Sequence, residues 1–320
     1  MGLAKVINSM LMPLGLAVVR RSTIERLSNN SDSNSLIQAY SSIGDRLDGI
    51  EKYLADLKVK TDVFQRDVLR HQVAEKWSLI DYISCSIVGG EELCTCPLCG
   101  FTSSANTLKQ FNSYCIFGGG LLLRYQCTNC DLIYGPKKML DLTPAELSSD
   151  YEWHYRVYEE GDSTAQEIRA FHLLKPSKSG IYLNYGAGAW SRSVEILRSE
   201  GWNVMAFEPH GSAQASADYV ISNRVELQKI GFDGVFSNNV LEHLRYPVEE
   251  LSFMQGIIKQ GGRMSHATPC FEYLFEYTRF HLFFYLGRSR SLLAERANLT
   301  VVDFVLDGEF MCALYEAKCS

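Results

Sequence analysis

A short glycine turn, Gly186-Ala187-Gly188, follows an apolar, strand-like run that ends at Tyr185, and a helix-like stretch comes after it. Glycines let the backbone approach a ligand where a β-carbon would clash. The acidic Glu208 closes the next apolar run about twenty residues further on, where a carboxylate can accept hydrogen bonds from both ribose hydroxyls. The pattern indicates a cradle for a nucleotide-type cofactor, although a tight turn with no ligand is the simpler alternative.

Two Cys-x-x-Cys pairs form the second group of residues that could do chemistry. The four cysteines are Cys96, Cys99, Cys127 and Cys130. Two thiolates separated by two residues on a turn can face one ion, and a second pair completes the tetrahedral shell of a structural zinc. The segment 100–126 between the pairs is expected to form a hairpin. Buried thiols without metal are the alternative, and Cys94 or Cys115 could replace one ligand.

Further motifs follow the glycine turn in a fixed order. Asp233 opens an apolar run, Leu241-Glu242-His243 follows that run, an amphipathic stretch covers 248–259, and Gly261-Gly262 comes next. In order and spacing, residues 150–320 resemble the class I S-adenosylmethionine-dependent methyltransferases. The resemblance implies an α/β, Rossmann-like domain with a seven-stranded, mostly parallel sheet whose last strand is antiparallel. Residues 301–306 and 311–317 are the expected terminal antiparallel pair.

Within that family the chain most resembles the ubiquinone-type O-methyltransferases and the sugar methyltransferases of surface-polysaccharide pathways. Thr268-Pro269, the aromatic stretch 280–284 and a cysteine module ahead of the cofactor domain belong to that pattern and extend the resemblance to residues 94–320. It implies O-methylation of a sugar hydroxyl in a cell-surface glycan or its lipid-linked precursor. C- or N-methylation of a nucleotide sugar is an alternative. A non-catalytic scaffold with a degenerate cofactor site is another, because Asn184 stands where the family usually has Asp and Trp190 where a third glycine is common.

The resemblance also implies roles for individual residues. S-adenosylmethionine is expected to contact Tyr185, Gly186, Ala187, Gly188, Glu208 and either Ser237 or Asn238. Methyl transfer from a sulfonium needs no acid at the leaving group, so one base that takes the proton of an acceptor hydroxyl suffices. The candidates for this catalytic base are His243 and His281. The alternatives are that His243 braces its loop and that His281 is a core histidine.

The N-terminal quarter has a different pattern. Between residues 35 and 80, apolar residues recur at alternating steps of three and four with charged residues between them, which predicts a coiled-coil helix and a homo-oligomer. A single helix packed on the protein's own body is the alternative. Residues 1–30 form an amphipathic segment that is too short and broken to span a bilayer. Peripheral membrane contact and docking on another subunit both fit it.

Length and charge limit the possible classes. A chain of 320 residues exceeds one average domain, and 46% hydrophobic residues suffice for a sizeable core. The formal charge of −6 argues against general nucleic-acid binding. Ten cysteines diluted over this length favour a reducing compartment, so we expect a cytoplasmic protein. A peripheral position at the inner face of the membrane fits residues 1–30. The expected parts are the N-terminal segment 1–30, the coil 35–80, the zinc module 90–140 and the methyltransferase domain 150–320.

Overall fold

The computed structural model describes residues 33–87, 93–158, 161–188, 191–209 and 217–318. The chain divides into two units, Met1–Asp67 and Val68–Ser320. The amphipathic segment 1–30 and Trp190 lie outside the described residues. Of the helices that the structure describes, none is both long and apolar enough to cross a membrane.

Helix α3 (Ser33–Ile87) is continuous over 55 residues. Between residues 41 and 67 none of its side chains is buried, and its apolar residues Leu54 and Phe64 are 57% and 68% exposed. Further along the same helix, Val73 and Trp77 are buried in the core of the second unit. The helix therefore has an exposed apolar pattern over its first part, and its assembly into a coiled coil stays a prediction.

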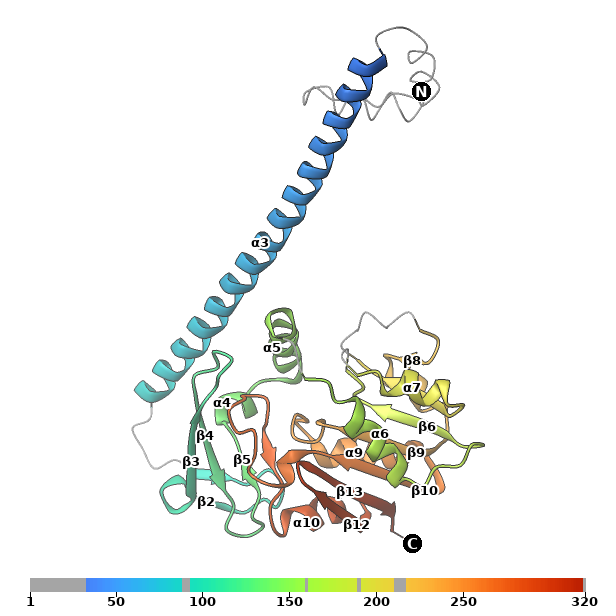
Figure 1. Ribbon diagram of the computed structural model, residues 1–320. Helices are drawn as coiled ribbons and strands as arrows, with labels where there is room; N and C mark the ends of the chain where they lie inside the picture. The colour runs from blue at the N-terminus through green and yellow to red at the C-terminus, as the bar shows by residue number, and fades with distance from the viewer. Residues whose placement is uncertain (1–32, 88–92, 159–160, 189–190, 210–216, 319–320) are drawn as a thin grey trace. The chain divides into compact units, whose positions relative to one another are not determined.

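The second unit contains a seven-stranded sheet with the order β12-β13-β10-β9-β6-β7-β8 (Figure 1). The strands are β6 (Ile181–Tyr185), β7 (Asn203–Phe207), β8 (Val220–Ile221), β9 (Phe232–Asn238), β10 (Ile258–Ala267), β12 (Leu299–Asp307) and β13 (Phe310–Ala317). The pairs from β8 to β10 are parallel, and β13 runs antiparallel to both of its neighbours. The mostly parallel α/β sheet with an antiparallel last strand agrees with the sequence-based expectation.

Helices cover both faces of this sheet. Phe171 of α6 (Thr164–Leu173) and Leu197 of α7 (Ser193–Ser199) belong to one buried cluster. Met254 of α9 (Pro247–Ile257) and Leu293 of α10 (Ser289–Arg296) belong to another. Short α8 (Arg224–Leu227) follows β8. Strands buried on both faces read as continuous apolar runs, which is why β6 and β9 stand out in the sequence.

The cysteine module is built from short strands that precede the large sheet. They are β1 (Leu93–Thr95), β2 (Thr102–Ser104), β3 (Lys109–Tyr114), β4 (Leu121–Gln126) and β5 (Ile133–Tyr134). Strands β3 and β4 pair as the hairpin expected between the two cysteine pairs. The sequence did not predict that β11 (Phe283–Phe284) pairs with β5. The module and the methyltransferase-like region thus share a four-stranded sheet, and their cores are continuous.

Two helices connect the module to β6. Helix α4 (Lys137–Leu140) is a single turn, and α5 (Pro144–Val157) begins with a capping box. Thr143 accepts a hydrogen bond from the Glu146 backbone, while the Glu146 side chain accepts one from the Thr143 backbone. This pairing satisfies two backbone donors at the start of α5 and fixes where the helix begins.

Candidate functional site

The order of the strands reverses between β6 and β9. From β6 the chain moves outward to β7 and β8 on one side, and it returns to β9 and β10 on the other. Ligands bind outside the carboxyl ends of strands where the order reverses in this way. The glycine turn follows β6 and residues 239–243 follow β9. They are close, because a β-carbon added to Gly186 would come within 2.8 Å of Val240 Cγ2.

The glycine turn is tied to the end of β7. Gly186 and Gly188 have φ values of +73° and +63°, which glycine adopts without steric cost. The amides of Gly186 and Ala187 donate to the Phe207 carbonyl at 2.9 and 3.1 Å. The Glu208 carboxylate accepts from the Gly188 amide at 2.9 Å. The structure therefore brings the turn and Glu208 together, as the sequence predicts.

Sequence reasoning missed a buried carboxylate beneath this turn. Asn184 donates to Glu167 of α6 at 2.5 Å, and the hydroxyls of Ser191 and Ser193 donate to the same oxygen at 2.8 and 2.5 Å. Ser163 donates to the other oxygen at 2.5 Å. Burial raises the pKa of Glu167, while these hydrogen bonds act in the opposite direction. Asn184 occupies the position of β6 where the resembled family usually has Asp. Glu167 of α6 places a carboxyl group beside it.

Two expected cofactor contacts lie in the interior instead. The Tyr185 hydroxyl donates to Glu250 of α9 at 2.6 Å, so only the backbone of Tyr185 borders the turn. Ser237 is fully buried, and its hydroxyl lies 2.7 Å from His266 Nδ1. Asn238 is partly exposed at the end of β9. Of the Ser237 and Asn238 pair, Asn238 is better placed to reach a ligand at the carboxyl ends of β6 and β9.

The two candidate bases lie together. The rings of His243 and His281 have centroids 4.9 Å apart. His243 Nδ1 is 3.2 Å from the Tyr151 hydroxyl of α5, and His281 Nδ1 is 3.3 Å from Cys270 Sγ. Burial lowers the pKa of His243 to about 4 and lowers that of His281 well below its usual range. Both imidazoles are therefore neutral near pH 7.

Buried Arg124 holds the segment that carries His281. Its guanidinium donates to the carbonyls of Glu276 and Thr278, both at 2.8 Å, and to the carbonyl of His281 at 3.2 Å. The Leu282 amide also donates to the Glu242 carbonyl at 2.8 Å. The Arg124 bonds join β4 to the segment before β11. The Leu282 bond joins that segment to the turn after β9. The sequence shows Arg124 only as one basic residue in a strand, which carries no signal of this role.

Aromatic side chains pack beside His243. Tyr151 packs against Phe280 with ring centroids 4.4 Å apart and against His243 at 5.5 Å. The ring centroids of Tyr151 and Tyr155, which are both on α5, lie 4.9 Å apart. Of these three rings, Tyr151 is therefore the one in contact with His243.

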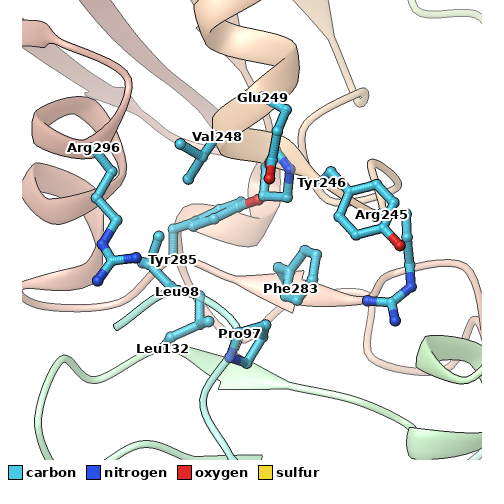
Figure 2. A pocket seen from close by; sticks show the side chains of 11 residues that line it. Pro97, Leu98, Leu132, Arg245, Tyr246, Val248, Glu249, Phe283, Tyr285 and Arg296 are labelled. Atoms are coloured by element: carbon cyan, nitrogen blue, oxygen red, sulfur yellow. The ribbon is translucent and has the colours of Figure 1, made fainter. Parts of the chain in front are cut away.

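A cleft of about 300 Å³ lies next to the residues that follow His243 (Figure 2). It is lined by Pro97 and Leu98 of the cysteine module, by the start of α9 and by Phe283. Arg245 and Arg296 stand on opposite sides of it. The Tyr285 side chain lines the cleft and donates its hydroxyl to the Leu241 carbonyl at 3.0 Å. The cleft therefore borders the turn that carries His243, and its size is at the lower limit for small-ligand sites.

The four predicted zinc ligands form a separate cluster. The sulfur atoms of the four cysteines lie within 4.8 Å of one another. The two Cys-x-x-Cys turns repeat one hydrogen-bond pattern, in which the amide four residues on donates to the first cysteine's carbonyl. The residues that donate these bonds, Gly100 and Asp131, both have positive φ. Cys115 lies beside Arg279 instead, so it is not part of the cluster.

The spacing within this cluster fits a tetrahedral metal. Cys96 Sγ is 3.7 Å from Cys130 Sγ, and Cys99 Sγ is 3.5 Å from Cys127 Sγ. Zn–S bonds of about 2.3 Å separate the sulfurs of a tetrahedron by about 3.8 Å. The Cys96 thiol, which lies beside Cys130, lowers the pKa of Cys130 and favours its thiolate form. The donor set and its geometry therefore suit a structural zinc.

Comparison with known proteins gave similarities only among solved structures. No family model matches the chain, and no curated protein does. A methyltransferase of calicheamicin biosynthesis is 12% identical over 55% of this chain and 59% of its own, with a TM-score of 0.39. The mitomycin 7-O-methyltransferase is 14% identical over 54% of this chain and 60% of its own, with a TM-score of 0.42.

A third similar structure is 1,6-didemethyltoxoflavin-N1-methyltransferase from Burkholderia thailandensis, with S-adenosylhomocysteine bound. It is 16% identical over 61% of this chain and 94% of its own, with a TM-score of 0.42. The chain spans about three fifths of the length of the first two structures. All three solved structures are methyltransferases, but at these identities and TM-scores the similarity does not assign this chain to a family.

Proposed function

We propose that this chain is an S-adenosylmethionine-dependent methyltransferase. The observation that carries the proposal is the arrangement at the carboxyl ends of β6 and β9. There the glycine turn is bonded to Glu208 and lies against Val240, in the turn after β9 that also carries His243. This is where open α/β sheets bind nucleotide-type ligands.

The residues around the turn fit the cofactor. Among the described atoms outside its chain neighbours, nothing lies within 4 Å of a β-carbon added to Gly188, so the backbone there is open to a ligand. Gly186, Ala187 and Gly188 would contact the methionine part, Glu208 would accept hydrogen bonds from the ribose, and Asn238 would border the middle. When bound, the cofactor supplies an electrophilic methyl group on a sulfonium. The protein's part is to align an acceptor and to help remove its proton.

The acceptor we propose is a sugar hydroxyl of a cell-surface glycan or its lipid-linked precursor. The partly exposed Tyr151, which packs on buried Phe280, supports this, because recognition sites combine apolar surfaces with a few polar groups that fix orientation. The neighbouring cleft adds two arginines that could contact anionic groups of such a substrate. The hydroxyl would lie beside His243 and His281, and one of these neutral imidazoles would accept its proton.

Two further parts belong to the proposal. Cys96, Cys99, Cys127 and Cys130 bind one structural zinc, which fixes the module that borders the cleft. The exposed apolar residues of α3 pair with a second copy of the chain and form the coiled coil. We place the protein in the cytoplasm, with peripheral membrane contact through residues 1–30.

Calorimetry with S-adenosylmethionine tests the enzymatic proposal. We expect binding by the full chain and its loss in Glu208→Ala. The matched control is Glu200→Ala, which removes an exposed carboxylate at the end of α7 and is expected to leave binding unchanged. No binding by the folded wild type at millimolar cofactor would overturn the proposal and favour a scaffold.

A further inference from the structure

Glu242, His243 and His281 bring three metal-binding donor atoms within 4.8 Å of one another. Glu242 and His243 are neighbours in the turn after β9, whereas His281 comes from the segment before β11. Glu242 is fully buried and His281 is 8% exposed. We propose that this histidine–glutamate cluster binds a divalent transition-metal cation. This inference rests on the proposed function, since the cation would act on the acceptor hydroxyl.

The donor types select the class of cation. Two imidazoles and one carboxylate suit Zn²⁺, Mn²⁺, Fe²⁺ or Co²⁺, whereas Mg²⁺ and Ca²⁺ prefer oxygen ligands only. A cation with bonds of about 2.1 Å holds its donors roughly 3.0 to 4.2 Å apart. Donor atoms that already lie within 4.8 Å need only a small closure to reach this spacing. Three protein ligands also leave positions open for a substrate, unlike the four-cysteine cluster.

The surroundings of the cluster orient the donors as in metal sites. Metal-binding histidines usually engage their second ring nitrogen with a neighbouring group, which fixes the ring. Nδ1 of His243 meets the Tyr151 hydroxyl at 3.2 Å, and Nδ1 of His281 meets Cys270 Sγ at 3.3 Å. We therefore assign Nε2 of each ring to the cation. The bond from the Leu282 amide to the Glu242 carbonyl holds the two segments in register.

The cation would make the acceptor hydroxyl a better nucleophile. A hydroxyl held by a divalent cation has a lowered pKa, and its proton passes to solvent water. The oxygen lone pair forms the new O–CH3 bond, the C–S bond breaks, and its electron pair returns to sulfur. With the cation present, His243 and His281 serve as ligands, and solvent takes the proton in place of either imidazole.

Titration of the purified full chain with Mn²⁺, followed by electron paramagnetic resonance, tests this site without an acceptor. Manganese is a poor competitor for zinc thiolate sites. We expect about one Mn²⁺ bound per chain, with affinity at least about 100-fold weaker in Glu242→Gln and about tenfold weaker in Tyr151→Phe. The control His172→Gln removes an exposed imidazole from α6 and is expected to bind Mn²⁺ as the wild type does.

The outcomes separate this inference from the proposed function. Wild-type protein that binds S-adenosylmethionine but no Mn²⁺ would overturn the metal site alone. Protein that binds Mn²⁺ in a Glu242-dependent way but no S-adenosylmethionine would overturn the methyltransferase proposal and keep the metal site. If Glu242→Gln does not fold, His281→Gln replaces it. Unchanged Mn²⁺ affinity in a folded variant of either residue would contradict the assignment.

Discussion

Replacement of Glu167 tests the hydrogen-bond network beneath the glycine turn. In Glu167→Ala, the buried donors Asn184, Ser191 and Ser193 lose the oxygen that they share. Each unsatisfied buried donor costs about 1 to 3 kcal/mol. Part of this loss is offset, because Asn184 and Ser193 lie 3.3 Å apart and can still pair, and because a carboxyl group no longer has to be buried.

The expected net loss is about 3 kcal/mol, which lowers the melting temperature by roughly 6 to 12 °C for a domain of this size. Glu167→Gln keeps one acceptor oxygen and is expected to lose about 1 to 2 kcal/mol. Because Asn184 precedes the glycine turn and Ser191 follows it, both variants should also bind S-adenosylmethionine more weakly, with Ala weaker than Gln. Thermal melts and calorimetry check this. An Ala variant that melts within 2 °C of wild type would refute the role of Glu167.

The pH dependence of stability in wild type and Glu167→Gln gives an independent check of the role of Glu167. The folded-state pKa of Glu167 is raised, mainly by burial. Its contribution to stability is therefore fully present below the unfolded pKa of about 4.5 and is lost as pH rises through the folded pKa. Glutamine does not titrate, so the destabilisation of Glu167→Gln relative to wild type should be larger at pH 5 than at pH 8. Thermal melts of both proteins at the two pH values check this. A destabilisation of Glu167→Gln that is larger at pH 8 than at pH 5 would contradict the raised pKa of Glu167.

Three further predictions concern other parts of the chain. Gly186→Ala should lower the melting temperature because its β-carbon meets Val240. Gly188→Ala should lower the melting temperature less but bind S-adenosylmethionine poorly. Equal effects of the two variants on melting temperature and on binding would contradict this contrast. Metal analysis should find about one zinc per chain, lost in Cys99→Ser together with thermal stability, and a well-folded metal-free wild type would contradict the zinc site. Removal of residues 1–67 should convert an oligomer into a monomer in sedimentation, and an unchanged oligomer would exclude the coil as the assembly element.

The local parts of the site could be predicted from the sequence. The glycine turn and Glu208 each follow directly after a buried strand, and parallel strands align their carboxyl ends at one edge. The two cysteine turns likewise carry their geometry in four consecutive residues. The hairpin between them was expected from a Phe/Tyr-rich pattern, and the terminal antiparallel pair from two apolar runs joined by a turn.

The long-range contacts could not be predicted in this way. Glu167 lies 17 residues before Asn184, on a helix whose rotation relative to β6 is decided by core packing. Arg124 meets the His281 carbonyl across 157 residues. Strand β11 has two residues, too few for a periodic pattern, yet it joins the cysteine module to the larger region. Tertiary packing determines such pairings, and a single sequence carries no local signal for them.

Hydrogen exchange of the full chain, with and without S-adenosylhomocysteine, tests the central claim most directly. If the cofactor binds where the strand order reverses, added ligand should slow amide exchange in residues 184–192, around Glu208 and in residues 237–243. Exchange in the turn between β12 and β13 should not change. Protection confined to other segments, or none at saturating ligand, would contradict the proposed cofactor site.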